Sequence, residues 1–280
     1  MRLTNASVFL IGFYIALLFF WLSAGLFASG NSSINFLTIF NGFQHNQQFG
    51  YIFAFVYAFI PLFGSLIGFR ISRKWGFSKG TIGKAIFYLS LSLLCWAVAE
   101  FIWSYYNFVL HTAVPYPAWS DVGWVLCYPF WAIGTFYLSA PSGARIGLSK
   151  ISGKLLLIII PILISLFSWY VLVVLARGGA ITSGGNFLTV FFDIAYPVGD
   201  VIILTLAFLI FGLSFKYWGG QIKWPVIIII IGFLLEYIAD FGFSYTTTVN
   251  TYYNGSWVDL VYATSLVLLS LGVSLLDVRE

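Results

Sequence analysis

The sequence predicts an all-α integral membrane protein in which eight transmembrane helices form two parallel four-helix repeats. Three observations support this fold class. The 280-residue chain is 61% hydrophobic and 8% charged, whereas soluble domains carry about 25% charged residues. Eight apolar segments approach the ~20 residues that a helix needs to cross a bilayer. The basic residues gather in alternate connections between these segments. A soluble globular protein is therefore excluded, and we expect the lipid bilayer to be its environment.

The eight expected spans follow one another through short connections. They are Ser7–Ser29, Gly50–Ser72, Ala85–Leu110, Ser120–Ala140, Leu155–Ala176, Phe187–Phe215, Trp224–Val249 and Trp257–Leu276. A β-barrel would show alternating strands of about ten residues, but runs such as Leu155–Ile164 are apolar on every face. The longest connection, Gly30–Gly50, is polar and aromatic, and we expect it to form an outward-facing cap.

The distribution of Lys and Arg predicts the orientation, because loops rich in these residues remain in the cytoplasm. With eight spans, 12 of the 13 basic residues fall on one side, and Arg177 is the one on the other side. We therefore expect a multi-pass protein of the cell membrane with both termini in the cytoplasm. The net charge of +4 then reflects topology, and no nucleic-acid partner is expected.

An internal repeat relates spans 3 and 4 to spans 7 and 8. The segment Ala99–Tyr105 (AEFIWSY) matches Ala239–Tyr245 (ADFGFSY) at an offset of 140 residues. At an offset of 138 residues, Trp119, Asp121, Trp124 and Gly134 match Trp257, Asp259, Tyr262 and Gly272. We therefore expect two halves, residues 1–152 and 153–280. Each half has an even number of spans, so the halves should be related by an axis along the membrane normal.

Seven of the nine acidic residues lie inside the apolar segments, and no basic residue accompanies them there. They are Glu100, Asp121, Asp193, Asp200, Glu236, Asp240 and Asp259. A charged carboxylate near the centre of a bilayer costs about 2.5–3.5 kcal/mol on insertion scales, so such residues are usually buried, paired or functional. The topology places all seven in the outer half of the membrane, with Glu236 the deepest. We interpret these carboxyls as the candidate functional residues.

Several arrangements of these carboxyls are compatible with the sequence. Asp121 and Asp259 begin their spans, where Asp caps free backbone amides. The other five lie within spans, where they either hydrogen bond neighbouring helices or line a shared polar cavity. Pro129 and Pro197 lie close to acidic residues and should kink their helices. Aromatic residues at the same level, among them Trp103, Tyr105, Tyr196 and Tyr245, form either an interfacial belt or the cavity walls.

Motifs for catalysis and for cofactors are lacking in the sequence. It has no HExxH, GxSxG or phosphate-binding loop, so we expect no enzymatic activity. Haem ligation and a retinal Schiff base are disfavoured, because no His and no Lys lies within an expected span. His45 and His111 both fall on the outer side and leave a metal site with carboxylates open. No cofactor is identified.

A series of short motifs connects the acidic residues in chain order. It runs from Ala99-Glu100 through Pro115-Tyr116-Pro117-Ala118-Trp119-Ser120-Asp121 and Cys127-Tyr128-Pro129 to Asp193, Tyr196-Pro197-Val198-Gly199-Asp200, Ala239-Asp240 and Gly255-Ser256-Trp257-Val258-Asp259. Between Leu91 and Asp277, this series resembles the multi-span N-terminal sensor regions that precede diguanylate cyclase (GGDEF) and related output domains in bacterial signalling proteins. The resemblance implies a sensory or ligand-binding membrane module. No output domain follows the last span, so we expect a partner membrane or cytoplasmic protein to carry the signal.

The leading hypothesis is therefore a membrane sensor with an outward-facing acidic and aromatic cavity for a small polar or cationic ligand, an ion or a proton. The five intramembrane carboxyls would bind the ligand, and the aromatic rings would contribute cation–π contacts. A cation- or proton-coupled transporter that uses the same carboxyls remains an alternative, as does a structural subunit of a larger membrane complex.

Overall fold

The structure is a computed structural model that describes residues 3–28, 47–214 and 222–277. Most of the connection expected to form an outward cap, together with His45, lies outside the described residues. The described chain is helical throughout, and no β-strand occurs in it. Two short elements, η2 (Phe77–Lys79) and α7 (Ala144–Leu148), connect the longer helices.

Eight helical stretches in the described chain are long and apolar enough to span a membrane, which confirms the predicted number. They are α1 (Asn5–Ala28), α3–α4 (Gln47–Tyr57 and Phe59–Lys74), α5–η3 (Thr81–Tyr105 and Tyr106–Leu110), α6 (Trp119–Ser139), α8–η4 (Ile151–Ser168 and Trp169–Leu175), α9 (Phe187–Ser214), α10 (Lys223–Thr248) and α11 (Trp257–Ser274). Their bounds differ from the expected spans by a few residues. The helices continue through Pro129 and Pro197, which both lie inside them.

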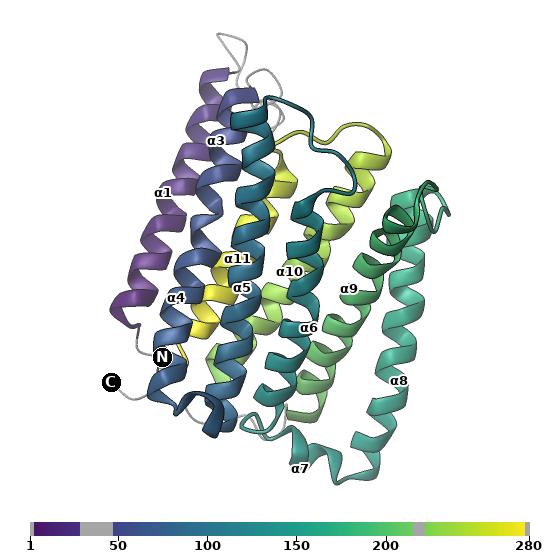
Figure 1. Ribbon diagram of the computed structural model, residues 1–280. Coiled ribbons are helices and arrows are strands. Elements are labelled where there is room, and N and C mark those ends of the chain that lie inside the picture. Colours follow the sequence, from purple (N-terminus) through teal and green to yellow (C-terminus); the bar gives the residue numbers. More distant parts are fainter. Residues whose placement is uncertain (1–2, 29–46, 215–221, 278–280) are drawn as a thin grey trace.

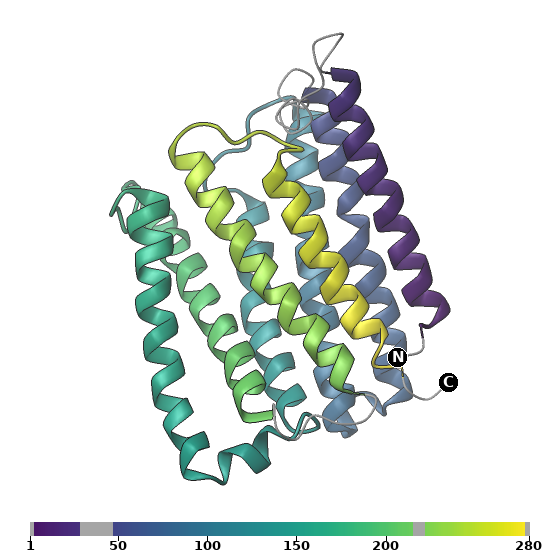
Figure 2. The ribbon, with the colours of Figure 1, turned by 180° about the vertical axis from the view of Figure 1, so that it is seen from behind.

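The spanning helices pack side by side as a bundle (Figure 1). The helix α1 forms one edge and contacts α11 and α4, whereas α8 forms the other edge and packs on α9 (Figures 1 and 2). Between these edges, the most extensive contacts join α5 to α6, α10 to α11, and α4 to α5. Further contacts between α4 and α11 and between α6 and α9 interleave segments that are far apart in the sequence.

Apolar side chains cover the outer surface of the bundle and fill its interior. On α8, Leu155, Ile158, Ile162 and Leu166 lie three or four residues apart and are all exposed. In water such a face would be costly, because burial of apolar surface drives folding. The interior contains fully buried residues such as Phe233. This distribution fits helices that are surrounded by lipid.

Glycine and small polar residues allow close approach in two helix pairs. A Cβ at Gly134 of α6 would lie 2.8 Å from the Leu89 side chain of α5, and one at Gly272 of α11 would lie 2.4 Å from the Ile229 side chain of α10. Small residues at helix interfaces let membrane helices pack tightly. These two pairs provide most of the walls of the cavity described below.

Both described ends of the chain lie at the same end of the bundle, as an even number of spans requires (Figure 1). Lys74, at the end of α4, forms an ion pair of 2.8 Å with Asp277 there. The connections 111–118, 176–186 and 249–256 lie at the opposite end. The chemistry of these two ends differs, and the cavity reaches only the second.

Candidate functional site

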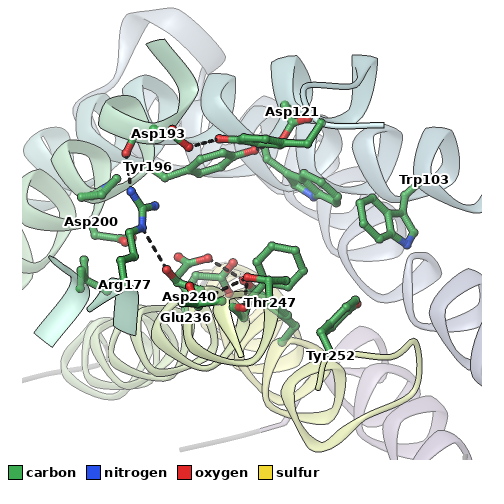
Figure 3. A pocket seen from close by; sticks show the side chains of 18 of the residues that line it. Trp103, Asp121, Arg177, Asp193, Tyr196, Asp200, Glu236, Asp240, Thr247 and Tyr252 are labelled. Carbon is green, nitrogen blue, oxygen red and sulfur yellow. Dashed lines mark hydrogen bonds between the residues drawn. The ribbon is translucent and has the colours of Figure 1, made fainter. Parts of the chain in front are cut away.

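All seven intramembrane carboxyls line one cavity of about 610 Å³. Figure 3 shows this cavity, and five of the seven acidic residues are labelled in it: Asp121, Asp193, Asp200, Glu236 and Asp240. The other two, Glu100 and Asp259, complete the set. The cavity extends from buried side chains of α5, α6, α9, α10 and α11 to exposed residues such as Ala180 and Ser183 in the connection between η4 and α9. It is therefore accessible from the end of the bundle where that connection lies.

Asp200 and Asp240 lie on facing helices and share a phenol donor. The Tyr128 hydroxyl lies 3.1 Å from Asp200 Oδ1 and 3.4 Å from Asp240 Oδ2. A second phenol, that of Tyr262, donates to Asp240 Oδ1 over 2.7 Å. Buried polar groups need such partners, and here two tyrosines stabilise a pair of acids on α9 and α10.

Glu236 lies one helical turn from Asp240 and accepts hydrogen bonds at both carboxyl oxygens. The indole Nε1 of Trp96 donates to Oε1 over 3.0 Å, and the Ser265 hydroxyl donates to Oε2. These donors belong to α5 and α11, so Glu236 joins three helices. The residue is buried.

Asp259, in the first turn of α11, lines the cavity. Its carboxylate accepts the Gly255 N–H, and the Tyr252 hydroxyl donates to Oδ1 over 2.9 Å. Burial and the nearby negative charge of Asp259 raise the pKa of Tyr252 well above its ordinary value, so this phenol remains a neutral donor. Glu100, from α5, is buried in the same region of the cavity.

Asp121, at the start of α6, likewise accepts hydrogen bonds from one backbone N–H and one tyrosine hydroxyl. It accepts the Ala118 N–H over 2.6 Å, and the Tyr196 hydroxyl of α9 donates to its Oδ1 over 2.7 Å. Asp121 and Asp259 both line the cavity. The Ala118 N–H that Asp121 accepts belongs to the residue that caps α6. Asp259, in contrast, accepts the N–H of Gly255, which immediately precedes the cap of α11.

Asp193 is held near the open end of the cavity by the loops on either side. The Tyr116 hydroxyl donates to Oδ1 over 2.7 Å. The backbone N–H and the hydroxyl of Ser183 donate to Oδ2 over 2.6 and 2.8 Å. Burial and then the hydrogen bond to Asp193 raise the pKa of Tyr116, so this phenol also remains a donor.

No basic residue lies within the expected apolar segments that carry the acids, but Arg177, which follows the fifth span, lines the same cavity. Arg177 follows η4, the π-helical end of the fifth span, and its guanidinium extends between α9 and α10 (Figure 3). The sequence shows Arg177 as the single outward basic residue. It does not show that the side chain turns into the bundle.

The predicted aromatic walls are present only in part. Trp103 and Tyr196 line the cavity, whereas Tyr105 and Tyr245 are 51% and 44% exposed and are not among its lining residues. Tyr105 is displaced around α5 from the face that carries Glu100 and Trp103.

Aromatic residues beyond the four named for the walls complete the cavity lining. They are Tyr57, Trp96, Tyr116, Trp124, Tyr128, Trp131, Phe243, Tyr252 and Tyr262. Helical spacing contains a signal for some of them, because Trp96 lies one turn before Glu100, and Trp103 lies one turn after it. The spacing of Asp121, Trp124 and Tyr128 on α6 follows the same rule. Positions at intervals of three and four from an acidic residue would have predicted these walls better than depth alone.

The candidate metal site is not assembled within the described part of the chain. No group of three or more His, Cys, Asp and Glu side chains there is arranged to hold a metal ion. His111 is exposed where η3 ends, and it does not line the cavity.

Comparisons with known proteins do not extend this description. No protein-family model, curated protein or solved structure matches the chain significantly.

Proposed function

We propose that this protein is a membrane receptor module that binds a small polar or cationic ligand in the acidic and aromatic cavity. The observation that carries the proposal is the convergence of seven carboxyls and one guanidinium on a cavity of about 610 Å³. Ligand pockets typically measure about 300–1,000 Å³. With so many acids and a single basic residue, the cavity favours a positively charged group.

Aromatic rings beside the carboxyls would also bind a positively charged group. Trp96 packs against Trp124 and Tyr262 at centroid distances of 6.2 and 5.9 Å, and Trp103 packs against Trp124 at 5.5 Å. Cations are attracted to the faces of Trp and Tyr, most strongly when water is excluded. A wall of indoles and phenols next to carboxyls is therefore suited to an ammonium group.

The same proposal includes an orientation with both termini in the cytoplasm and a bundle built from two related four-helix halves. Described basic residues lie at the end of the bundle opposite the cavity opening, in the last turns of α4 (Arg70 and Arg73), in η2 (Lys79) and at or just before the start of α8 (Lys150 and Lys154). This arrangement supports cytoplasmic termini and an outward-facing site. Matching close contacts in α5–α6 and α10–α11 support two related four-helix halves. Ligand binding between the halves would change their relative tilt, and a partner protein would detect this change at the cytoplasmic surface.

Thermal unfolding of the detergent-purified protein tests the proposal. A ligand at about 100 times its dissociation constant stabilises the folded state by about 2.7 kcal/mol. We expect amines to raise the Tm of the wild-type protein and to have little effect on Asp240→Asn. Asp277→Asn, at the opposite end of the bundle, is the matched control and should respond like wild type. A flat response of the wild-type protein to amines, metal ions and other polar probes would contradict the proposal.

A further inference from the structure

The guanidinium of Arg177 is held in the cavity wall by neutral oxygen acceptors. Its Nε donates to Ser244 Oγ over 3.1 Å, and one Nη donates to the carbonyl oxygens of Asp193 and Ile181 over 2.9 and 3.3 Å. These hydrogen bonds fix the guanidinium between α9 and α10, and they leave its second Nη unused.

Among the described residues, Arg177 forms no ion pair within 4.0 Å, although seven carboxyls line the same cavity. In the part of the chain that the structure describes, the one ion pair within 4.0 Å joins Lys74 to Asp277, at the other end of the bundle. The closest acidic residue along its contacts, Asp193, offers Arg177 its backbone carbonyl, while its carboxylate is occupied by Tyr116 and Ser183. An arginine that served only to neutralise the acids would pair with one of them.

A guanidinium with a free N–H edge is suited to a carboxylate or a phosphate group, which it binds through parallel hydrogen bonds. Thr247 and Thr248 line the cavity next to Ser244, but their hydroxyls already donate to the backbone carbonyls of Phe243 and Ser244. The buried indole nitrogen of Trp124 also has no acceptor among the described residues. The cavity thus presents unused donors as well as acids.

We propose that the ligand is a short zwitterion, with its anionic group at Arg177 and its ammonium group at the acids deeper in the cavity. This inference rests on the proposed function and names the ligand class of the same site. Ser244, Asp240 and Glu236 follow one another on α10 at intervals of four residues, which corresponds to about 6 Å each along the helix. With the guanidinium hydrogen bonded to Ser244, an ammonium group at Asp240 would lie one such interval, about 6 Å, further along α10. A chain of three carbons between the charges fits this spacing better than the single carbon of an α-amino acid.

Binding of four small probes to the purified full-length chain tests the inference. The probes are butylamine, butanoate, 4-aminobutanoate and glycine, measured by calorimetry and by thermal shift. We expect 4-aminobutanoate to bind about tenfold or more tightly than butylamine, because a charge-assisted pair with Arg177 adds to the amine contacts. Butanoate and glycine should bind more weakly than 4-aminobutanoate.

Arg177→Gln should remove this advantage, because Gln is neutral and lacks the fork. The ratio of the two dissociation constants should fall to about one, with butylamine binding unchanged or tighter. Arg73→Gln, at the other end of the bundle, keeps the cavity and should retain the wild-type ratio. If Arg177→Gln does not fold, Ser244→Ala removes one of the bonds that orient the guanidinium, and it should reduce the ratio several-fold.

The outcomes separate this inference from the function on which it rests. Two results would refute the proposal that the ligand is a zwitterion: butylamine binds but 4-aminobutanoate binds no tighter, or Arg177→Gln keeps the preference. In either case the proposal of a site for a cationic ligand would be retained. If no probe binds to folded wild-type protein, both proposals fail. Phosphoethanolamine has the same pair of charges, either free or as a lipid headgroup. Stabilisation by ethanolamine phospholipid in nanodiscs, without binding of the free compound, would assign the zwitterion to a lipid.

Discussion

The helix pairs α5–α6 and α10–α11 make the same close contacts with different side chains. Gly134 leaves room for Leu89 in the first pair, and Gly272 leaves room for Ile229 in the second. These residues match at offsets of 138 residues for the glycines and 140 for the apolar partners. One hydrogen bond also corresponds, because Cys127 Sγ lies 3.3 Å from the Ser92 carbonyl and Ser265 Oγ lies 3.1 Å from the Gly232 carbonyl.

The two pairs differ where they face each other across the cavity. The position of Trp96 in α5 corresponds to that of Glu236 in α10, and these two side chains hydrogen bond directly. Trp124 in α6 corresponds to Tyr262 in α11, whose hydroxyl donates to Asp240. At these two positions, α5–α6 presents indoles and α10–α11 presents a carboxyl and a phenol. In both pairs the packing positions hold glycine against an apolar side chain, whereas these two cavity-facing positions hold side chains of different chemistry.

The largest effect should follow from filling the two glycine positions. Gly134→Val and Gly272→Val would each place atoms within 3 Å of a neighbouring side chain, so the helices must separate. Overpacking of this kind typically costs about 1–3 kcal/mol, and we expect values near the upper end for both variants. The free energy of unfolding in mixed micelles measures this cost.

A matched control is available on α1, where a Cβ at Gly12 would meet no atom within 4 Å. Gly12→Val should therefore have a small effect. If only one of the two interhelical glycines were sensitive, the two pairs would not share their packing, and the proposed repeat would lose its main structural support.

Much of the scaffold could be predicted from the sequence, because hydrophobic length is a local property. The eight spans depend on runs of apolar residues, and seven carboxyls within those runs stand out against them. Their convergence on one cavity was predicted as one of two arrangements. The spacing of the acidic residues in the sequence could not distinguish a shared cavity from hydrogen bonds between helices, because both use the same residue types.

Other features depend on contacts that sequence reasoning cannot see. Arg177 follows the π-helical η4, and its guanidinium lines the cavity through hydrogen bonds to α9 and α10. Tyr128 reaches both Asp200 and Asp240 only because α6 packs against α9 and lies near α10. Tyr105 and Tyr245 were placed by depth alone, but the direction around the helix decides whether a side chain lines the cavity.

The contact between Trp96 and Glu236 should show an intermediate effect. In a double-mutant cycle with Trp96→Phe and Glu236→Gln, we expect a coupling energy of about 1–2 kcal/mol, because the indole N–H donates to a buried acid. Trp103→Phe with Glu236→Gln is the control, since Trp103 donates to Asn254 instead. That pair should be additive within about 0.5 kcal/mol. A coupling energy near zero between Trp96 and Glu236 would mean that α5 and α10 are energetically independent at this contact.

The smallest effect should distinguish Cys127 from Ser265, which occupy corresponding positions. Cys127→Ser keeps a donor for the Ser92 and Gly123 carbonyls, so we expect a change in unfolding free energy within about 0.5 kcal/mol. Ser265→Cys should cost about 1 kcal/mol, because Ser265 also donates to Glu236 and a thiol is a weaker donor. Equal costs for the two exchanges would show that Ser265 serves packing alone. A larger cost at Ser265 would show that the two corresponding positions differ in role. Cys127 would then contribute to helix packing alone, whereas Ser265 would also hold Glu236 in the cavity wall.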